Sequence, residues 1–294
     1  MENSLANGTD QKNGKQIVVW VILLFTLIAV CLLPFIVTGV TVQGLGKLRP
    51  SSTLFALCVA GFTLVGYTPS LSALLVAKFY PKGGGANLVL RQARIWRAGV
   101  GWYALALFGP AILFFIDEGV NLLLGGAPPK QWVVFPTLSG FFPGSLFFAF
   151  MGVLAGSVGE EFGWRGFAQP RLQQRYGALA ASLLTGTVWA TFHLWIVPIC
   201  PHCLSLTDIV VTQYLRLIAT AVLYAWLYNS SGGSLFLVMV AHAAHNVTVD
   251  LLPQVGGSAI IVALSYVAAA VIVVLLTDAR TLTRRSTGAQ VAGA

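Results

Sequence analysis

Long runs of apolar residues recur along this chain, and they constrain its fold more than any other feature of the sequence. A helix needs roughly 20 apolar residues to cross about 30 Å of hydrocarbon. Eight runs of about this length lie at residues 17–40, 54–77, 99–121, 143–169, 179–199, 208–228, 234–252 and 258–277. Only 9% of the 294 residues are charged and 57% are hydrophobic, which excludes a water-soluble globular fold. The sequence therefore predicts an all-α polytopic membrane protein with about eight transmembrane helices.

Polar segments at both ends flank one membrane domain. Residues 1–16 form an expected cytoplasmic N-terminal tail, residues 17–277 the transmembrane domain, and residues 278–294 a cytoplasmic C-terminal tail. The first apolar run has no obvious small-residue cleavage site, so we expect a retained span rather than a signal peptide. The fourth run is interpreted as a single helix that Pro170 ends.

The uneven distribution of positive charge predicts the orientation of the chain. The net charge is +8, and in a membrane protein such an excess marks cytoplasmic loops rather than a nucleic-acid partner. With the N-terminus in the cytoplasm, most Lys and Arg residues outside the spans fall on inner segments. We therefore expect a multi-pass protein of a bacterial-type cell membrane with both termini cytoplasmic. The inner segment 78–97 is predicted to carry a short basic interfacial helix with Arg91, Arg94 and Arg97 on it.

Ionisable residues inside three of the apolar runs are informative exceptions. Such a group at bilayer depth costs at least a few kcal/mol, so its presence indicates a functional site or a buried partner. The fourth run contains Glu160, Glu161 and Arg165. Glu161 and Arg165 are four residues apart and are predicted to pair on one helix face. Glu160 points about 100° away, so one carboxylate is expected to be structural and the other available.

Two further runs supply histidines. His193 follows Trp189 by four residues, and His242 precedes Asn246 by four residues. A buried glutamate beside a histidine can deprotonate water and later protonate a leaving amine, while a second histidine and an asparagine amide can stabilise an oxyanion. The same glutamate and two histidines could instead hold a zinc ion with an open position for water. The spacing leaves these two chemistries open.

These residues resemble the motifs of a known family, the CPBP (CAAX prenyl protease and bacteriocin-processing, also called Abi) intramembrane proteases. The family pattern is Glu-Glu-x-x-x-Arg, then an aromatic residue followed four positions later by His, then His-x-x-x-Asn, each in a separate transmembrane helix. The first motif reads here as Glu160, Glu161 and Arg165. The other two read as Trp189–His193 and His242–Asn246.

The resemblance covers about residues 138–255, the expected catalytic core. The Pro-containing segment 68–75 adds support, because it is similar to an upstream helix of the family. One departure is Trp189, where the family commonly has Phe, and this change is conservative. Three motifs in the right order within eight spans make the resemblance specific.

The resemblance implies an enzyme, an intramembrane endopeptidase with six site residues. They are Glu160, His193, His242, Asn246, Glu161 and Arg165. The first two activate water, the next two stabilise the oxyanion or take part in a metal site, and the last two orient the cluster. Metal dependence stays open, with zinc as the candidate cofactor. The implied substrate is a membrane-associated peptide or protein, lipidated peptides included, that reaches the site from the cytoplasmic side.

Two other classes of function stay open. Intramembrane Glu and His residues also form proton relays, although the lack of obvious inverted repeats disfavours a proton-coupled transporter. The second alternative is a catalytically silent scaffold or regulator of the same family. Solute flux in liposomes would indicate the transporter, and complementation by motif mutants would indicate the scaffold.

Four polar residues near or outside the motifs have simpler interpretations. His245 is expected to be a helix–helix hydrogen-bond partner, with a supporting or metal-ligand role as the alternative. Arg216 lies in mid-span and is expected to form a buried salt bridge, with recognition of a substrate's terminal carboxylate as the alternative. Asp117 and Glu118 lie near the outer end of the third run, where solvation accounts for them.

The segment Cys200-Pro201-His202-Cys203 lies in a loop that the predicted topology places outside. Four cysteines in the whole chain are too few for a disulfide scaffold. Free thiols are the favoured interpretation of this pair, and a local disulfide and a metal site stay open.

Overall fold

The computed structural model describes residues 2–80, 85–128, 142–252 and 259–284, and helices dominate it. The α-helices are α1 (Glu2–Thr38), α2 (Thr53–Val65), α3 (Thr68–Phe79), α4 (Gly85–Gln92), α5 (Val100–Leu123), α6 (Phe142–Gly163), α7 (Gln169–Tyr176), α8 (Ala178–Phe192), α9 (Leu217–Ser230), α10 (Leu235–Leu251) and α11 (Ala259–Leu276). Narrower 3₁₀ turns are η1 (Leu45–Lys47) and η3 (His193–Ile199), and wider π turns are η2 (Trp164–Ala168) and η4 (Asp208–Arg216). An isolated β-bridge joins Thr277 to Arg284, and no residue in the described ranges lies in a β-strand. The predicted all-α fold is therefore confirmed.

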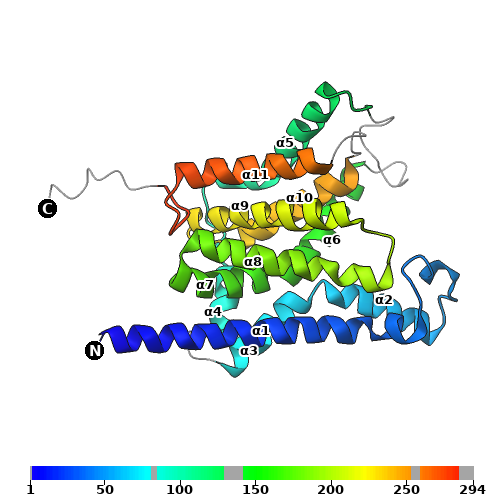
Figure 1. Cartoon of the computed structure of the whole chain (residues 1–294), viewed down its shortest axis with the longest axis horizontal. Helices are drawn as coiled ribbons and strands as arrows, with labels where there is room; N and C mark the ends of the chain where they lie inside the picture. Colours follow the sequence, from blue (N-terminus) through cyan, green and yellow to red (C-terminus); the bar gives the residue numbers. More distant parts are fainter. Residues whose placement is uncertain (1, 81–84, 129–141, 253–258, 285–294) are drawn as a thin grey trace.

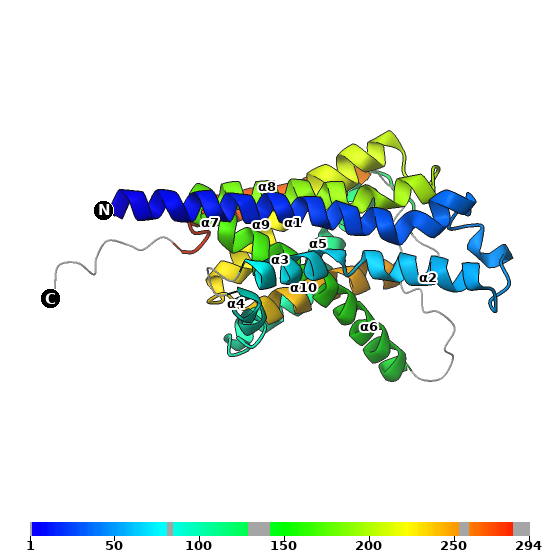
Figure 2. The ribbon, with the colours of Figure 1, turned by 90° about the horizontal axis from the view of Figure 1, so that it is seen from below.

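The long helices form a bundle. α8, α9 and α11 lie side by side, and α1 runs nearly parallel to them (Figure 1). The beginning of α1 and the end of α11 lie at the same end of the bundle (Figure 1), as an even number of crossings requires. α6 is inclined to the other helices, and its first turns project from the bundle (Figure 2). Its packing partners are α3 and α10, which places the end of α6 in the interior.

Length and composition identify four helices among the described residues that can cross a membrane. They are Asn13–Thr38, Val100–Leu123, Ala178–Ile199 and Asp208–Ser230. The bent pair of α2 and α3 makes a fifth if it counts as one span. Two of the other predicted runs contain shorter apolar helices, Leu235–Val249 and Ile260–Leu276. The helices thus indicate a membrane protein, whereas the count of eight spans stays a prediction.

The second predicted run is not one straight span. α2 and α3 meet at an angle of 67°, with Pro69 in the first turn of α3. Proline has no N–H group with which to continue the hydrogen bonds of the preceding helix. On the same residue, the Pro69 carbonyl accepts a hydrogen bond from Trp20 Nε1 on α1 at 3.2 Å. The bend is therefore held from the side by α1.

The fourth predicted run continues through Pro170 instead of ending there. α6 passes into the wider turn η2, and then into α7, which ends at Tyr176. Pro170 occupies the first turn of α7, where a helix tolerates a missing N–H group. Gly177 ends α7 with a φ of 80°, a backbone conformation that favours glycine. The expectation that Pro170 terminates this helical segment was wrong for that reason.

The polar start of α1 packs against α7 instead of standing apart from the bundle. Arg171 Nε donates to Gln16 Oε1 at 2.7 Å, and Asn13 Nδ2 donates to Gln174 Oε1 at 2.8 Å. Burial lowers the pKa of Arg171 to about 10, which leaves its guanidinium charged at neutral pH. The segment interpreted as an N-terminal tail is thus helical in the described part and contributes to the fold.

The predicted basic interfacial helix is shorter than its arginine spacing suggests. α4 ends at Gln92, so Arg91 lies in its last turn while Arg94 and Arg97 follow it. The chain after α4 is held by tertiary hydrogen bonds, because the carbonyl of Ile95 accepts from Ser234 Oγ. The prediction of one helix through all three arginines was therefore wrong.

Two glycines allow α6 to approach the bend between α2 and α3. A Cβ atom on Gly159 would lie 2.7 Å from the Gly66 carbonyl oxygen, and one on Gly163 would lie 2.5 Å from the Pro69 carbonyl oxygen. Small residues four positions apart let helix backbones pack closely in membranes. Glu160 and Glu161 lie between these glycines, so this contact fixes the position of the candidate catalytic carboxylates.

The Cys200–Cys203 pair forms a disulfide bond. Gln43 Nε2 donates to Cys200 Sγ at 2.7 Å, and the Val42 amide donates to the Ile199 carbonyl at 3.0 Å. The loop after η3 is therefore pinned to the segment that follows α1. The favoured interpretation of these cysteines as free thiols was wrong, and the disulfide alternative is the one that the structure contains.

Candidate active site

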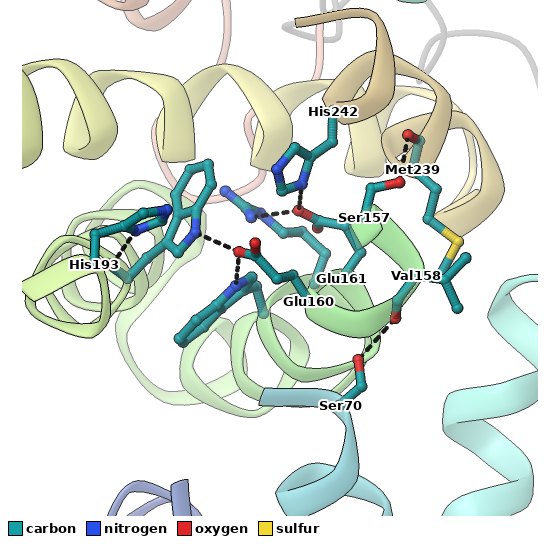
Figure 3. Close-up of polar contacts among 11 residues, drawn as sticks. Ser70, Ser157, Val158, Glu160, Glu161, His193, Met239 and His242 are labelled. Carbon is teal, nitrogen blue, oxygen red and sulfur yellow. Dashed lines mark hydrogen bonds and ion pairs between the residues drawn. The ribbon is translucent and has the colours of Figure 1, made fainter. Parts of the chain in front are cut away.

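Glu161 is the most deeply buried carboxylate of the predicted cluster, with 0% of its surface exposed. Its Oε1 accepts from Arg165 Nη1 at 2.9 Å and from His242 Nδ1 at 2.8 Å (Figure 3). The predicted ion pair between Glu161 and Arg165 is therefore present, one helical turn apart. The bond to His242 adds α10 to the cluster, which the spacing within α6 could not show.

The contact with Glu161 fixes the orientation of the His242 ring. A carboxylate oxygen accepts hydrogen bonds, so Nδ1 must carry the proton in this pair. The other nitrogen, Nε2, then has a free lone pair when the ring is neutral and an N–H group when the ring is protonated. His242 can therefore donate a second hydrogen bond only as an imidazolium.

Glu160 has different partners. Its Oε2 accepts from Trp164 Nε1 at 3.0 Å and from Trp189 Nε1 at 2.7 Å. Among the described residues both hydrogen bonds to this carboxylate end on Oε2. The two indole groups thus hold the carboxylate in one orientation while Oε1 keeps its lone pairs for a further donor.

Trp189 connects the two halves of the cluster. Its carbonyl oxygen accepts a hydrogen bond from His193 Nδ1 at 2.9 Å, because a carbonyl can only accept. Its ring lies under the Arg165 guanidinium at 4.6 Å from ring centre to Cζ, a distance that gives a favourable cation–π contact. The same residue therefore orients Glu160, His193 and Arg165.

Six residues from three helical segments make up what we call the candidate catalytic cluster. They are Glu160, Glu161, Arg165, Trp189, His193 and His242. Figure 3 shows the two glutamates of α6 lying between the His193 side and the His242 side. Five of the six predicted site residues are thus close together in a connected set of contacts.

Asn246 and His245 do not join these contacts. Asn246 lies one turn beyond His242 on α10 and is partly exposed, and no described residue is hydrogen-bonded to its side chain. His245 Nδ1 is 2.9 Å from Tyr266 Oη on α11. The expectation that His245 is a helix–helix hydrogen-bond partner is therefore confirmed.

Two aromatic residues of the site were missed by reasoning from the motifs. Trp164 binds Glu160, and the Tyr224 ring lies 4.9 Å from Arg165 Cζ and 5.8 Å from the His242 ring centre. Trp164 could have been found, since it follows Glu160 by four residues just as Arg165 follows Glu161. Tyr224 carried no comparable signal, because α9 reaches the site only through helix packing.

The described residues do not fit the zinc alternative. No group of three His, Cys, Asp or Glu side chains in the described ranges is placed to hold a metal ion. His245 faces Tyr266, and the charge of Glu161 is already engaged by Arg165. A positive guanidinium beside a carboxylate opposes the binding of a second cation there.

A second set of ionisable side chains lies elsewhere in the bundle. Asp117 and Glu118 on α5 are 1% and 2% exposed, so the expectation that solvent surrounds them was wrong, because α10 and α11 pack against α5. Arg216, at the end of η4, interacts electrostatically with Asp117 and Tyr266. No ion pair within 4.0 Å joins Arg216 to an acidic side chain that the structure describes, so a salt bridge of Arg216 stays a prediction.

Comparison with known proteins tests the family resemblance. Residues 142–248 match the model of a protein family described as type II CAAX prenyl endopeptidase, Rce1-like. This range contains all six predicted site residues, and the match confirms the resemblance to CAAX-type intramembrane proteases. None of the curated proteins matches the chain. The matched family consists of proteases, which supports a peptidase.

Proposed function

We propose that this protein is an intramembrane endopeptidase that hydrolyses a peptide bond with water activated by Glu160 and His193. The observation that supports the proposal most strongly is the convergence of three separate helical segments on one cluster, which hydrogen bonds and a cation–π contact connect. Glu160 and Glu161 come from α6, His193 from the start of η3, and His242 from α10. Ionisable groups buried in a membrane cost free energy, so their presence indicates a functional site.

Glu160 and His193 are suited to move the proton of an attacking water molecule. The indole N–H groups of Trp164 and Trp189 hold Oε2 of Glu160, and Oε1 takes the proton while the water oxygen attacks the carbonyl carbon. His193 donates through Nδ1 to the Trp189 carbonyl. Its other nitrogen, Nε2, is therefore the one that can exchange a proton with the water molecule or the leaving amine. The proton then passes to the leaving amine when the carbon–nitrogen bond breaks.

His242 stabilises the oxyanion of the tetrahedral intermediate, together with the Asn246 amide. Because Nδ1 donates to Glu161, a protonated ring presents Nε2–H to the oxyanion, and Glu161 balances the added charge. Arg165 pairs with the Glu161 carboxylate, and its guanidinium lies against the Trp189 ring. Glu161 and Arg165 therefore act as positioning residues.

The proposed substrate is a membrane-associated peptide or protein, lipidated peptides included, that enters from the cytoplasmic side. The proposed topology places both termini in the cytoplasm of a bacterial-type cell. Zinc has no step in this mechanism, because the described donors do not converge on one position. The metal content of the purified protein tests the zinc alternative, and one bound zinc ion per active molecule would support it.

The experiment compares membrane peptides by mass spectrometry in cells that carry the wild type, Glu160→Gln, His193→Ala or His242→Ala. The matched control is His202→Ala, which changes an exposed loop histidine. Each catalytic variant is expected to lower cleavage of a substrate found in this way at least about 100-fold, while the control cleaves like the wild type. Full activity of purified, folded Glu160→Gln protein would overturn the proposal.

A further inference from the structure

The Cys200–Cys203 disulfide closes a loop in which only Pro201 and His202 lie between the two cysteines. A disulfide stabilises a fold by restricting the unfolded chain, and this effect grows with the length of the loop that it closes. A loop this short restricts the unfolded chain little. Cys-X-X-Cys pairs are also the arrangement in which reactive thiols are commonly found. The spacing therefore favours a reactive pair over a purely structural one.

The two sulfur atoms of this pair differ in accessibility and in hydrogen bonding. Cys203 is exposed, whereas only 1% of the surface of Cys200 is exposed. Gln43 Nε2 donates to Cys200 Sγ at 2.7 Å and lies 3.4 Å from Cys203 Sγ. A thiolate from solvent can therefore reach Cys203. The Gln43 amide is placed to stabilise the negative charge that then develops on Cys200.

The disulfide is joined to the candidate catalytic cluster through η3, which begins at His193 and ends just before Cys200. η3 has seven residues, whereas 3₁₀ helices seldom exceed three or four because their hydrogen-bond geometry is poorer than that of an α-helix. The Ile199 carbonyl at its end accepts from the Val42 amide at 3.0 Å. The shape of η3 thus depends on contacts that hold the end next to the disulfide.

We propose that Cys200–Cys203 is a thiol–disulfide exchange site for a dithiol, and that its disulfide form holds η3 and thereby positions His193. In the proposed topology the loop lies on the outer side of the membrane, so the dithiol reaches it from there. The effect on His193 rests on the proposed peptidase function. The exchange between the disulfide and the dithiol does not depend on it.

The exchange takes place in two steps. One thiolate of the dithiol attacks Cys203 Sγ, the bond between the two cysteines breaks, and its electron pair leaves on Cys200 Sγ, which takes up a proton. The second thiolate of the dithiol then attacks the dithiol's own sulfur in the mixed disulfide, and Cys203 leaves as a thiolate and is protonated. Two electrons and two protons thus pass from the dithiol to the protein, and the dithiol becomes a disulfide.

The first experiment measures the rate at which dithiothreitol reduces the pair in folded, purified protein, by trapping free thiols with N-ethylmaleimide and weighing the peptides. Gln43→Glu places a negative charge beside the departing thiolate and is expected to slow reduction about fivefold. Gln43→Leu removes the hydrogen bond without adding a charge and is expected to slow reduction about twofold. Ser51→Ala, an exposed position further along the same loop, is the matched control and leaves the rate unchanged.

The second experiment measures how reduction affects η3, with hydrogen exchange of backbone amides followed by mass spectrometry. After reduction, amides in residues 41–45 and 194–203 are expected to exchange at least about tenfold faster, while those of α9 do not change. The kcat for a cleaved peptide is expected to fall about tenfold, because a misplaced catalytic group loses its alignment. The loss is partial, since Trp195 of η3 still packs against Phe62 of α2.

The double variant Cys200→Ser/Cys203→Ser is expected to behave like the reduced wild type, both with and without dithiothreitol. A kcat of this variant that still falls on addition of dithiothreitol would show that the reductant acts elsewhere, and would overturn the link to His193. The reduced wild-type protein gives the same comparison if the double variant does not fold.

A pair that dithiothreitol reduces only when the protein unfolds overturns the exchange site, as does a reduction rate that Gln43→Glu leaves unchanged. Reduction without faster amide exchange in η3 and without loss of cleavage overturns the link to His193. Faster amide exchange in η3 after reduction, in a protein that cleaves no peptide in either state, would support the exchange site and count against the peptidase proposal.

Discussion

Two sets of buried ionisable side chains in this bundle differ in how their charges are balanced. In the candidate catalytic cluster, Glu161 is tied to Arg165 and His242 by short contacts. Around Arg216 the described structure has electrostatic neighbours but no ion pair. The first set is organised without a ligand, as a preorganised catalytic site requires. In the second set, the Arg216 Nε atom is buried without a hydrogen-bond partner among the described residues.

Removing Glu161 is the strongest way to test this difference. Glu161→Ala leaves Arg165 buried without a counter-ion, and it is expected to lower the free energy of unfolding by about 3–5 kcal/mol. Arg216→Ala is expected to cost about 1 kcal/mol or less, because no buried carboxylate loses an ion-pair partner. Unfolding of the purified proteins in detergent measures both. Similar losses for the two variants would show that Arg216 is balanced as well as Arg165.

The glycine contact of α6 provides the next largest effect. Gly163→Ala places a methyl group against the Pro69 carbonyl, and the overpacking is expected to cost about 1–3 kcal/mol. Gly156→Ala on the same helix has nothing within 4 Å of the new Cβ and is expected to be neutral or slightly stabilising. An equal effect of both glycine variants on unfolding would contradict the close approach.

Trp189→Phe distinguishes the role of the indole N–H group from the role of the aromatic ring. The Phe ring still lies near Arg165, while Glu160 loses a hydrogen-bond donor, so kcat is expected to fall about tenfold with a stability loss of about 1 kcal/mol. Trp226→Phe, which changes a tryptophan outside the cluster that packs against Trp102, is the control and should leave kcat unchanged. Steady-state kinetics with a cleaved peptide distinguishes the two. A kcat loss of the same size in both variants would reject a specific role for the Trp189 N–H group.

Two tyrosine hydroxyls give the smallest expected effects. Tyr266→Phe removes the contact with His245 and is expected to cost about 1 kcal/mol of unfolding free energy. Tyr224→Phe removes a buried hydroxyl that has no partner among the described residues, so it should be neutral or slightly stabilising. Thermal unfolding measures the difference. A larger loss for Tyr224→Phe would show that its hydroxyl has a partner, for example a bound water molecule.

The motifs could be predicted from the sequence because they are local. Glu161 and Arg165 are one helical turn apart, so their pairing follows from the helix repeat alone. Arg216 and Asp117 could not be interpreted in the same way, since their surroundings depend on how α5, η4 and α11 pack. The bend at Pro69 and the continuation through Pro170 show the same limit, because a proline in the first turn of a helix can either break or extend the helical path.

The sequence by itself determined that this is a helical membrane protein whose motif residues lie in three of its apolar segments. The scarcity of charge and the lengths of the apolar runs leave no other way to satisfy the backbone. Only the tertiary structure decided which groups meet: His242 with Glu161, and two indoles with Glu160. Contacts between helices depend on crossing angles and on close approaches such as that of Gly163 to Pro69, and these are set by packing across the whole bundle rather than by spacing along one helix.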